Sequence, residues 1–143
     1  MCIRKLIASA CWAVLLSCQQ QGNHSLTVLE IYDKHLVSKD IVNKIADPYY
    51  ALHFRQGFKE DAIAVFANEK KKHVFLATTD EAVSLATTVT LAKKGITAIE
   101  VKIDGYGLLH IIPDARYNYL LIDLDKEQKQ LKIRHTNITP KYL

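Results

Sequence analysis

Cysteine is absent from the last 125 residues of this 143-residue chain. The only cysteines are Cys2, Cys11 and Cys18. A disulfide between any two of them would cross-link only the start of the chain, and no nearby histidines give a metal-type spacing. If the chain is cut before Cys18, the mature protein has one thiol, at its first position. An exported domain of that kind has no second thiol with which to mispair.

Glycine, proline and net charge are also scarce. Five glycines and three prolines exclude a collagen-like or low-complexity chain, and the length fits one domain. Arg4 and Lys5 contribute two of the four excess positive charges, so the chain after residue 17 holds 17 basic and 15 acidic residues. Because the positive and negative charges are nearly equal in number, the surface attracts phosphate only weakly at long range. We therefore expect no nucleic-acid partner.

The motifs of common enzyme classes are missing too. Gly105 and Gly107 stand in "DGYG", a turn between two expected strands, with no helix after it to hold a phosphate. There is no G-x-S-x-G segment for a serine nucleophile. We therefore expect no enzyme, no catalytic residue and no cofactor.

A few titratable residues are candidates for a small periplasmic enzyme. Asp123 and Asp125 lie two residues apart in an expected strand, so they share a face and could share a metal or a proton. The simpler interpretation leaves both in water, opposite a face of alternating leucine and isoleucine. His110 could be a base in a pocket and His53 could contact a ligand. No two histidines have a spacing that favours metal binding, so no metal is expected.

The N-terminal segment has the layout of a secretory signal peptide over residues 1–17. Arg4 and Lys5 precede "LIASACWAVLL", an uncharged run of eleven residues, and the small Ser17 follows. This run is shorter than the roughly 20 apolar residues that span a bilayer. A buried N-terminal helix of a cytosolic domain is the alternative.

"LLSC" resembles the lipobox of bacterial lipoproteins, with Leu15, Leu16 and Ser17 before Cys18. Leu16 stands where the family prefers a small residue, and ordinary signal cleavage is the alternative. The resemblance implies diacylglycerol transfer to the Cys18 sulfur, cleavage, and acylation of the new amino group, for example with palmitate. It implies a membrane-anchored protein of the bacterial cell envelope, facing the periplasm. By the same resemblance, Gln19 after the cysteine implies sorting to the outer rather than the inner membrane of a typical Gram-negative cell.

The mature chain is expected to contain a flexible tether over residues 18–25 and a single α+β domain over residues 26–143. The fold class expected is a largely antiparallel sheet of about five to six strands packed against one or two helices. One helix follows an N-cap at Ser38 and ends before Pro48, and a second runs from a capping box at Thr78 to Gly95. Strands are expected over residues 61–67, 73–79, 96–103, 108–112, 119–125 and 131–135. Residues 26–32 fit a strand or the start of a helix.

Residues 62 to about 125 resemble in outline the small domain of the SseB-like (enhanced serine sensitivity) family. The shared features are a hairpin, a helix opened by "TTDEA", and a strand that leads to a glycine-containing turn before "LL". No diagnostic motif is matched, so this resemblance concerns architecture and implies no function.

Tyrosines are the remaining candidates for binding. Tyr49 and Tyr50 belong to one aromatic cluster, for which plain core packing is the simpler interpretation, and Tyr106 stands at the tip of a turn. Tyrosine is enriched in interfaces because it joins a large contact area to a polar tip. We therefore expect a protein-binding module, for example an immunity-type lipoprotein that inhibits a toxin. The alternative is an accessory or assembly lipoprotein of an envelope or secretion complex.

Overall fold

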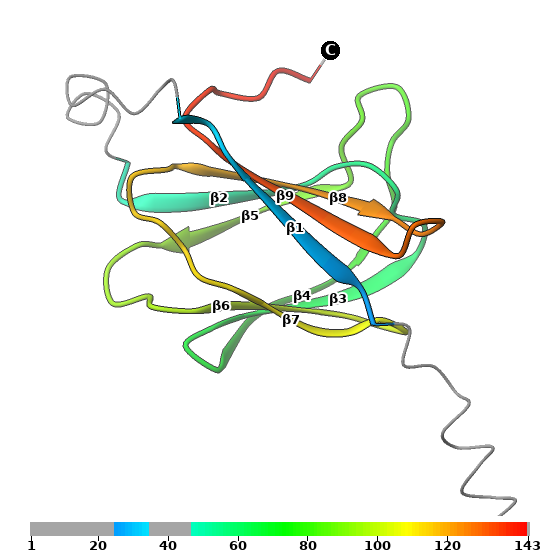
Figure 1. Ribbon diagram of the computed structural model, residues 1–143, viewed down its shortest axis with the longest axis horizontal. Coiled ribbons are helices and arrows are strands. Elements are labelled where there is room, and N and C mark those ends of the chain that lie inside the picture. Colours follow the sequence, from blue (N-terminus) through cyan, green and yellow to red (C-terminus); the bar gives the residue numbers. More distant parts are fainter. Residues whose placement is uncertain (1–24, 35–46, 143) are drawn as a thin grey trace, which may run out of the picture.

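Two β-sheets make up the part of the chain that the computed structural model describes, residues 25–34 and 47–142. Their nine strands are β1 (Thr27–Tyr32), β2 (Tyr49–Phe54), β3 (Asp61–Ala67), β4 (Lys70–Ala77), β5 (Thr87–Ala92), β6 (Ile99–Ile103), β7 (Gly107–Ile111), β8 (Tyr119–Asp125) and β9 (Gln130–Thr136). Sheet A has the strand order β1-β9-β8-β2-β5 and sheet B the order β4-β3-β6-β7. Figure 1 shows sheet A above sheet B.

Sheet A mixes parallel and antiparallel pairs, whereas sheet B is antiparallel throughout. β1 runs parallel to β9, and β2 runs parallel to β8, although each pair is far apart in the sequence. β8 and β9 form an antiparallel hairpin, as do β3 and β4, and β6 and β7. Non-local parallel pairs require long connections, so they leave no short-range signal in the sequence.

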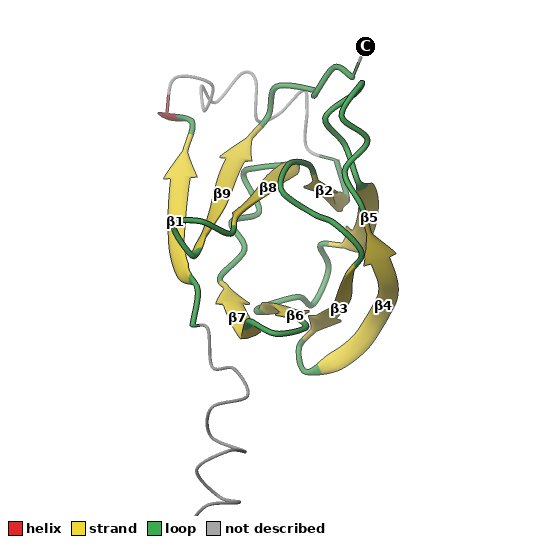
Figure 2. Cartoon of the chain, turned by 90° about the vertical axis from the view of Figure 1, so that its right-hand side faces the viewer, coloured by secondary structure: helices red, strands yellow, loops and turns green. Residues whose placement is uncertain are grey.

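The core lies between the two sheets and is built from alternating apolar side chains. In β6, Ile99, Val101 and Ile103 are fully buried, as the period of two predicts. Leu120, Ile122 and Leu124 form the corresponding face of β8. These side chains belong to a single buried cluster that both sheets supply. Figure 2 shows the two sheets facing each other.

The expected α+β fold class is wrong. The described residues hold nine strands in two sheets and no α-helix. The helix expected from Thr78 to Gly95 is replaced by a turn and the strand β5, which pairs antiparallel with β2. The expected helix after Ser38 lies outside the described residues. The "TTDEA" helix on which the SseB-like resemblance depended is therefore not formed.

The physical reason lies in the residues after the expected cap. Asp80 caps only one turn, in which its side chain accepts a hydrogen bond from Ala82 N and its carbonyl accepts one from Ser84 N. Ser84 then has a positive φ of 55°, which ends the turn. The next residues, "TTVTLA", are rich in β-branched side chains, and Val89 and Leu91 are buried while their neighbours are exposed. This period of two favours a strand over a helix.

Most expected strands are confirmed. β3 and β8 have the predicted bounds, and β4, β6, β7 and β9 overlap the predicted runs. Residues 26–32 contain the strand β1, and the unassigned "YYALHF" forms β2. Within the described ranges, no helix has the length and apolar character needed to cross a membrane.

Candidate functional site

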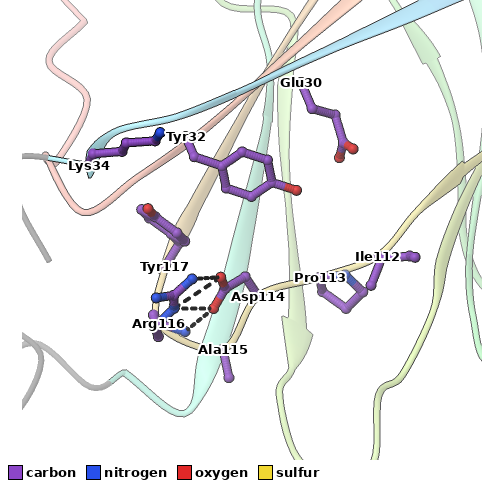
Figure 3. Close-up of a pocket in the computed structure, with 9 residues that line it drawn as sticks. All are labelled: Glu30, Tyr32, Lys34, Ile112, Pro113, Asp114, Ala115, Arg116 and Tyr117. Atoms are coloured by element: carbon purple, nitrogen blue, oxygen red, sulfur yellow. Dashed lines mark hydrogen bonds and ion pairs between the residues drawn. The ribbon is translucent and has the colours of Figure 1, made fainter.

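A groove of about 940 Å³ lies between the C-terminal half of β1 and the segment that connects β7 to β8. Figure 3 shows Glu30 and Tyr32 on one side of it, and the Asp114–Arg116 pair with Pro113 on the other. The remaining lining residues are Lys34, Ile112, Ala115 and Tyr117. The groove therefore combines aromatic, apolar and charged surface.

The strand β1 forms one wall of the groove and one edge of sheet A. Thr27 N donates a hydrogen bond to Lys129 O at 2.9 Å, and Asp33 N donates one to His135 O at 3.0 Å. In a parallel pair this pattern turns the backbone groups of alternate residues toward the partner strand. The backbone groups of Val28, Glu30 and Tyr32 therefore point away from β9. No strand of the described chain pairs with that edge.

The side chains of β1 alternate between the two faces of sheet A. Leu29 and Ile31 lie on the outer face and are exposed by 41% and 45%. Glu30 and Tyr32 lie on the inner face, where they line the groove. The edge strand therefore offers apolar contact on one side and aromatic and acidic contact on the other.

Two lining residues of the groove, Tyr32 and Tyr117, pack on His135, which is fully buried. Its ring lies parallel to that of Tyr32, with 4.2 Å between the centroids, and meets Tyr117 edge-on at 6.0 Å. Its Nε2 atom lies 3.1 Å from Glu30 Oε1. Burial, reinforced by the Glu30 carboxylate, raises the pKa of the Tyr32 phenol, so this group stays neutral and can donate a hydrogen bond.

The opposite wall carries an ion pair inside a tight turn. Arg116 Nη2 lies 2.6 Å from Asp114 Oδ2, and Arg116 N also donates a hydrogen bond to Asp114 Oδ1 at 3.0 Å. The side-chain hydrogen bonds from Arg116 lower the pKa of Asp114, so the pair stays charged. Asn137 Nδ2 donates a hydrogen bond to Arg116 O, which fixes this turn to the end of β9.

The sequence-predicted acidic pair lies outside this groove. Asp123 and Asp125 share the outer face of sheet A, as their spacing predicts, and both are half-buried. Asp123 is paired with Arg55, whose Nε donates a hydrogen bond to Asp123 Oδ1 at 3.1 Å. Asp125 accepts a hydrogen bond from Gln128 N and lies 3.8 Å from Lys132 Nζ. Each carboxylate is therefore held by its own cation.

The two candidate histidines lie on different sheets. His53 Nδ1 lies 2.8 Å from the Tyr142 hydroxyl, and its ring stacks on that of Tyr142. Burial lowers the pKa of His53, and the charge of Arg55 adds to this effect. His110 is exposed on the outer face of sheet B, 3.5 Å from Glu100 Oε1. Among the described residues, no group of three or more His, Cys, Asp or Glu could hold a metal ion.

The three predicted tyrosines also lie apart from the groove. Tyr49 is half exposed at the start of β2, while Tyr50 is buried in the core, 2% exposed. Tyr106 packs half-buried against the core at the β6–β7 turn. Cys18, the predicted lipidation site, lies outside the described residues. Sequence reasoning missed Glu30 and Tyr32, since only the parallel pairing of β1 with β9 brings them to His135.

Comparison with known proteins identifies no relative: no protein family, no curated protein and no solved structure matches this chain.

Proposed function

We propose that this protein is a lipid-anchored protein of the bacterial cell envelope that binds a protein partner at the groove beside β1. An extended segment of the partner pairs with the open edge of β1, and its side chains enter the groove. The observation that carries this proposal is the six-residue edge strand whose outward backbone groups border an aromatic groove. Addition of a strand to a sheet edge is a common mode of peptide recognition.

The charges of the groove favour binding over catalysis. Its two carboxylates, Glu30 and Asp114, already contact His135 and Arg116. Paired in this way, they fix the orientation of the walls and offer hydrogen-bonding groups to a partner. The exposed ring of Tyr32 supplies contact area at low cost in side-chain entropy, and the buried ring of Tyr117 packs beside it.

Two versions of this function remain as proposals. In the first, the protein is an immunity-type inhibitor that neutralises a toxin in the periplasm. In the second, it is an accessory or assembly lipoprotein of an envelope or secretion complex. The identity of the captured partner separates them, because the first predicts one stoichiometric toxin and the second predicts resident membrane proteins.

The anchor is tested at Cys18. Cells that produce the wild-type chain or Cys18→Ala are grown with a fatty-acid analogue, and the protein is then purified. We expect label in the wild type alone, because the proposed acyl chains require the Cys18 sulfur and the amino group that cleavage exposes. Equal label in both proteins contradicts the lipoprotein assignment.

The groove is tested by a pair of variants at one position. Glu30→Ala and Glu30→Pro both lose the contact with His135, but only proline also loses the backbone N–H that points away from β9. Proline is tolerated on an edge strand at such a position. The full chain captures its partner from envelope extracts, and the affinity of the identified partner is then measured for each variant.

We expect Glu30→Pro to bind at least about fivefold more weakly than Glu30→Ala, which corresponds to the loss of one net hydrogen bond of about 1 kcal/mol. Circular dichroism checks that both variants keep the β fold. Equal affinities contradict strand addition at β1.

A further inference from the structure

A basic pocket of about 350 Å³ lies at the far side of the molecule from β1, between the β3–β4 hairpin and the turn after β5. Lys70, Lys72 and His73 line it from β4, and Lys94 lines it from the turn. Among the described residues that line the pocket, there is no carboxylate. The pocket therefore gathers cationic side chains from two separate segments.

The position of these side chains is fixed by Asn68 at the hairpin turn. Asn68 adopts a positive φ of 48°. Its Nδ2 donates a hydrogen bond to Gly95 O at 2.5 Å, and its Oδ1 accepts hydrogen bonds from Thr97 N and Ala98 N. These bonds tie the hairpin to the segment that carries Lys94, so the cations are held together before any ligand arrives.

The same strand carries an exposed apolar surface. Val74 and Leu76 lie on the outer face of sheet B and are exposed by 65% and 71%. Their partners on β3 are Ala64 and Ala62, so small side chains leave both of them prominent. His73 pairs with a buried valine of β3 and so lies on the opposite face of β4 from Val74 and Leu76. The cations and the apolar side chains therefore meet along the edge of β4 that pairs with no strand of the described residues.

We propose that β4 rests on the anionic surface of a phospholipid bilayer, with lipid phosphates at the basic pocket and Val74 and Leu76 at the acyl boundary. This inference rests on the proposed envelope location. Basic residues next to exposed apolar side chains are the combination that binds such interfaces. Between residues 62 and 77, Glu69 is the only carboxylate against three lysines.

The proposed anchor agrees with this orientation. The start of β1 and the β3–β4 hairpin lie on opposite sides of the molecule, but in both views they lie at its lower end, where sheet B is (Figures 1 and 2). Residues 18–24 span at most about 25 Å at full extension, so a membrane-anchored Cys18 keeps that end near the lipid surface. Lysines on an edge strand also discourage aggregation, but that role does not explain two exposed apolar residues on the same strand.

The test measures vesicle binding of the full chain carrying Cys18→Ser, so that acyl chains do not contribute. The vesicles contain phosphatidylethanolamine with or without phosphatidylglycerol, and binding is measured by flotation. The basic variant combines Lys70→Gln, Lys72→Gln and Lys94→Gln. The apolar variant combines Val74→Ser and Leu76→Ser. All proteins share the same N-terminal segment, so its own contribution to binding cancels.

A matched control removes the same charge elsewhere: Lys59→Gln, Arg134→Gln and Lys141→Gln, all at exposed positions outside the pocket. Since each lysine near an anionic surface contributes about fivefold in affinity, we expect the basic variant to bind phosphatidylglycerol vesicles on the order of a hundredfold more weakly. The apolar variant is expected to lose about tenfold or more, because it gives up the burial of two large side chains. The control should lose less than threefold.

Three results would overturn the proposal. An equal loss in the control shows only general charge attraction. If the apolar variant binds vesicles as well as the unsubstituted protein does, β4 does not contact the bilayer through Val74 and Leu76. Inorganic phosphate that displaces the vesicles completely, at matched ionic strength, assigns the pocket to a free anion. The fatty-acid labelling of Cys18 is independent of all three, so a failure here is distinct from a failure of the anchor.

Discussion

Gly57 lies where the loop after β2 passes the backbone of β8, and we expect Gly57→Ala to destabilise the domain strongly. Its φ is +86°, and an added Cβ would lie 1.7 Å from the carbonyl oxygen of Leu124. At the same place, Leu124 N donates a hydrogen bond to Gln56 O at 2.9 Å. The two backbones must separate to accept an alanine, so the substitution tests the non-local pairing of β2 with β8.

Two costs add up in this variant. An alanine in the left-handed region costs about 1–2 kcal/mol. The forced separation of packed backbones costs about 1–3 kcal/mol more. The free energy of unfolding should therefore fall by about 2–5 kcal/mol, a large part of the roughly 5–15 kcal/mol typical of a domain. Urea denaturation followed by far-ultraviolet circular dichroism measures this loss.

Gly105→Ala is the matched control. Gly105 also has a positive φ, +81°, but an added Cβ would meet nothing within 4 Å. This variant should lose only the conformational part, about 1–2 kcal/mol. If the two variants lose the same stability, the close approach to Leu124 does not restrain the fold and the reasoning fails.

Two further predictions concern the outer face of sheet A. Burial, and to a lesser degree the charge of Arg55, lowers the pKa of His53 in the folded protein. As the pH falls, the His53 ring is therefore protonated in the unfolded chain before it is protonated in the folded one. Stability should thus fall as the pH drops below about 6.5, and less steeply in His53→Gln; equal slopes in urea titrations at several pH values contradict this. Arg55→Gln should lose about 1 kcal/mol at low salt, and less at 1 M salt, because it breaks a half-buried pair with Asp123. A loss that salt does not change argues against an electrostatic cause.

Strands could be predicted from the sequence where one face of the strand is apolar and a short turn connects it to its partner strand. The β3–β4 and β8–β9 hairpins are indicated in the sequence by short apolar runs on either side of a charged connection. The pairing of β1 with β9 and of β2 with β8 could not be predicted in this way. These pairs join residues about a hundred and about seventy positions apart, and their register depends on packing rather than on a turn.

The mistaken helix shows which signal prevails when two conflict. Thr78 and Glu81 match a capping box, but a cap contributes only about 1 kcal/mol. Burying Val89 and Leu91 on one face of β5 contributes about 1.5–3 kcal/mol for each side chain. The alternation of polar and apolar residues in "TTVTLA" was therefore the stronger indicator of secondary structure, and it was present in the sequence.

The groove was missed for a related reason. Glu30 and Tyr32 become a site only through His135, which lies on a strand about a hundred residues later. The sequence showed a single tyrosine and a single glutamate in a weakly alternating run. Tyr50, by contrast, belonged to a visible aromatic cluster but is a core residue. The clustering of aromatic residues along the sequence thus led to a buried tyrosine, whereas the groove depends on contacts between neighbouring strands of sheet A.

The two proposed surfaces are compatible because they lie on opposite sides of the molecule. β1 begins at the level of sheet B and runs away from it, so its C-terminal half, which lines the groove, lies farther from the outer face of sheet B (Figures 1 and 2). The basic pocket lies beside β4, at the opposite edge of sheet B from β7. A domain that rests on lipid through β4 therefore keeps the open edge of β1 accessible to a partner.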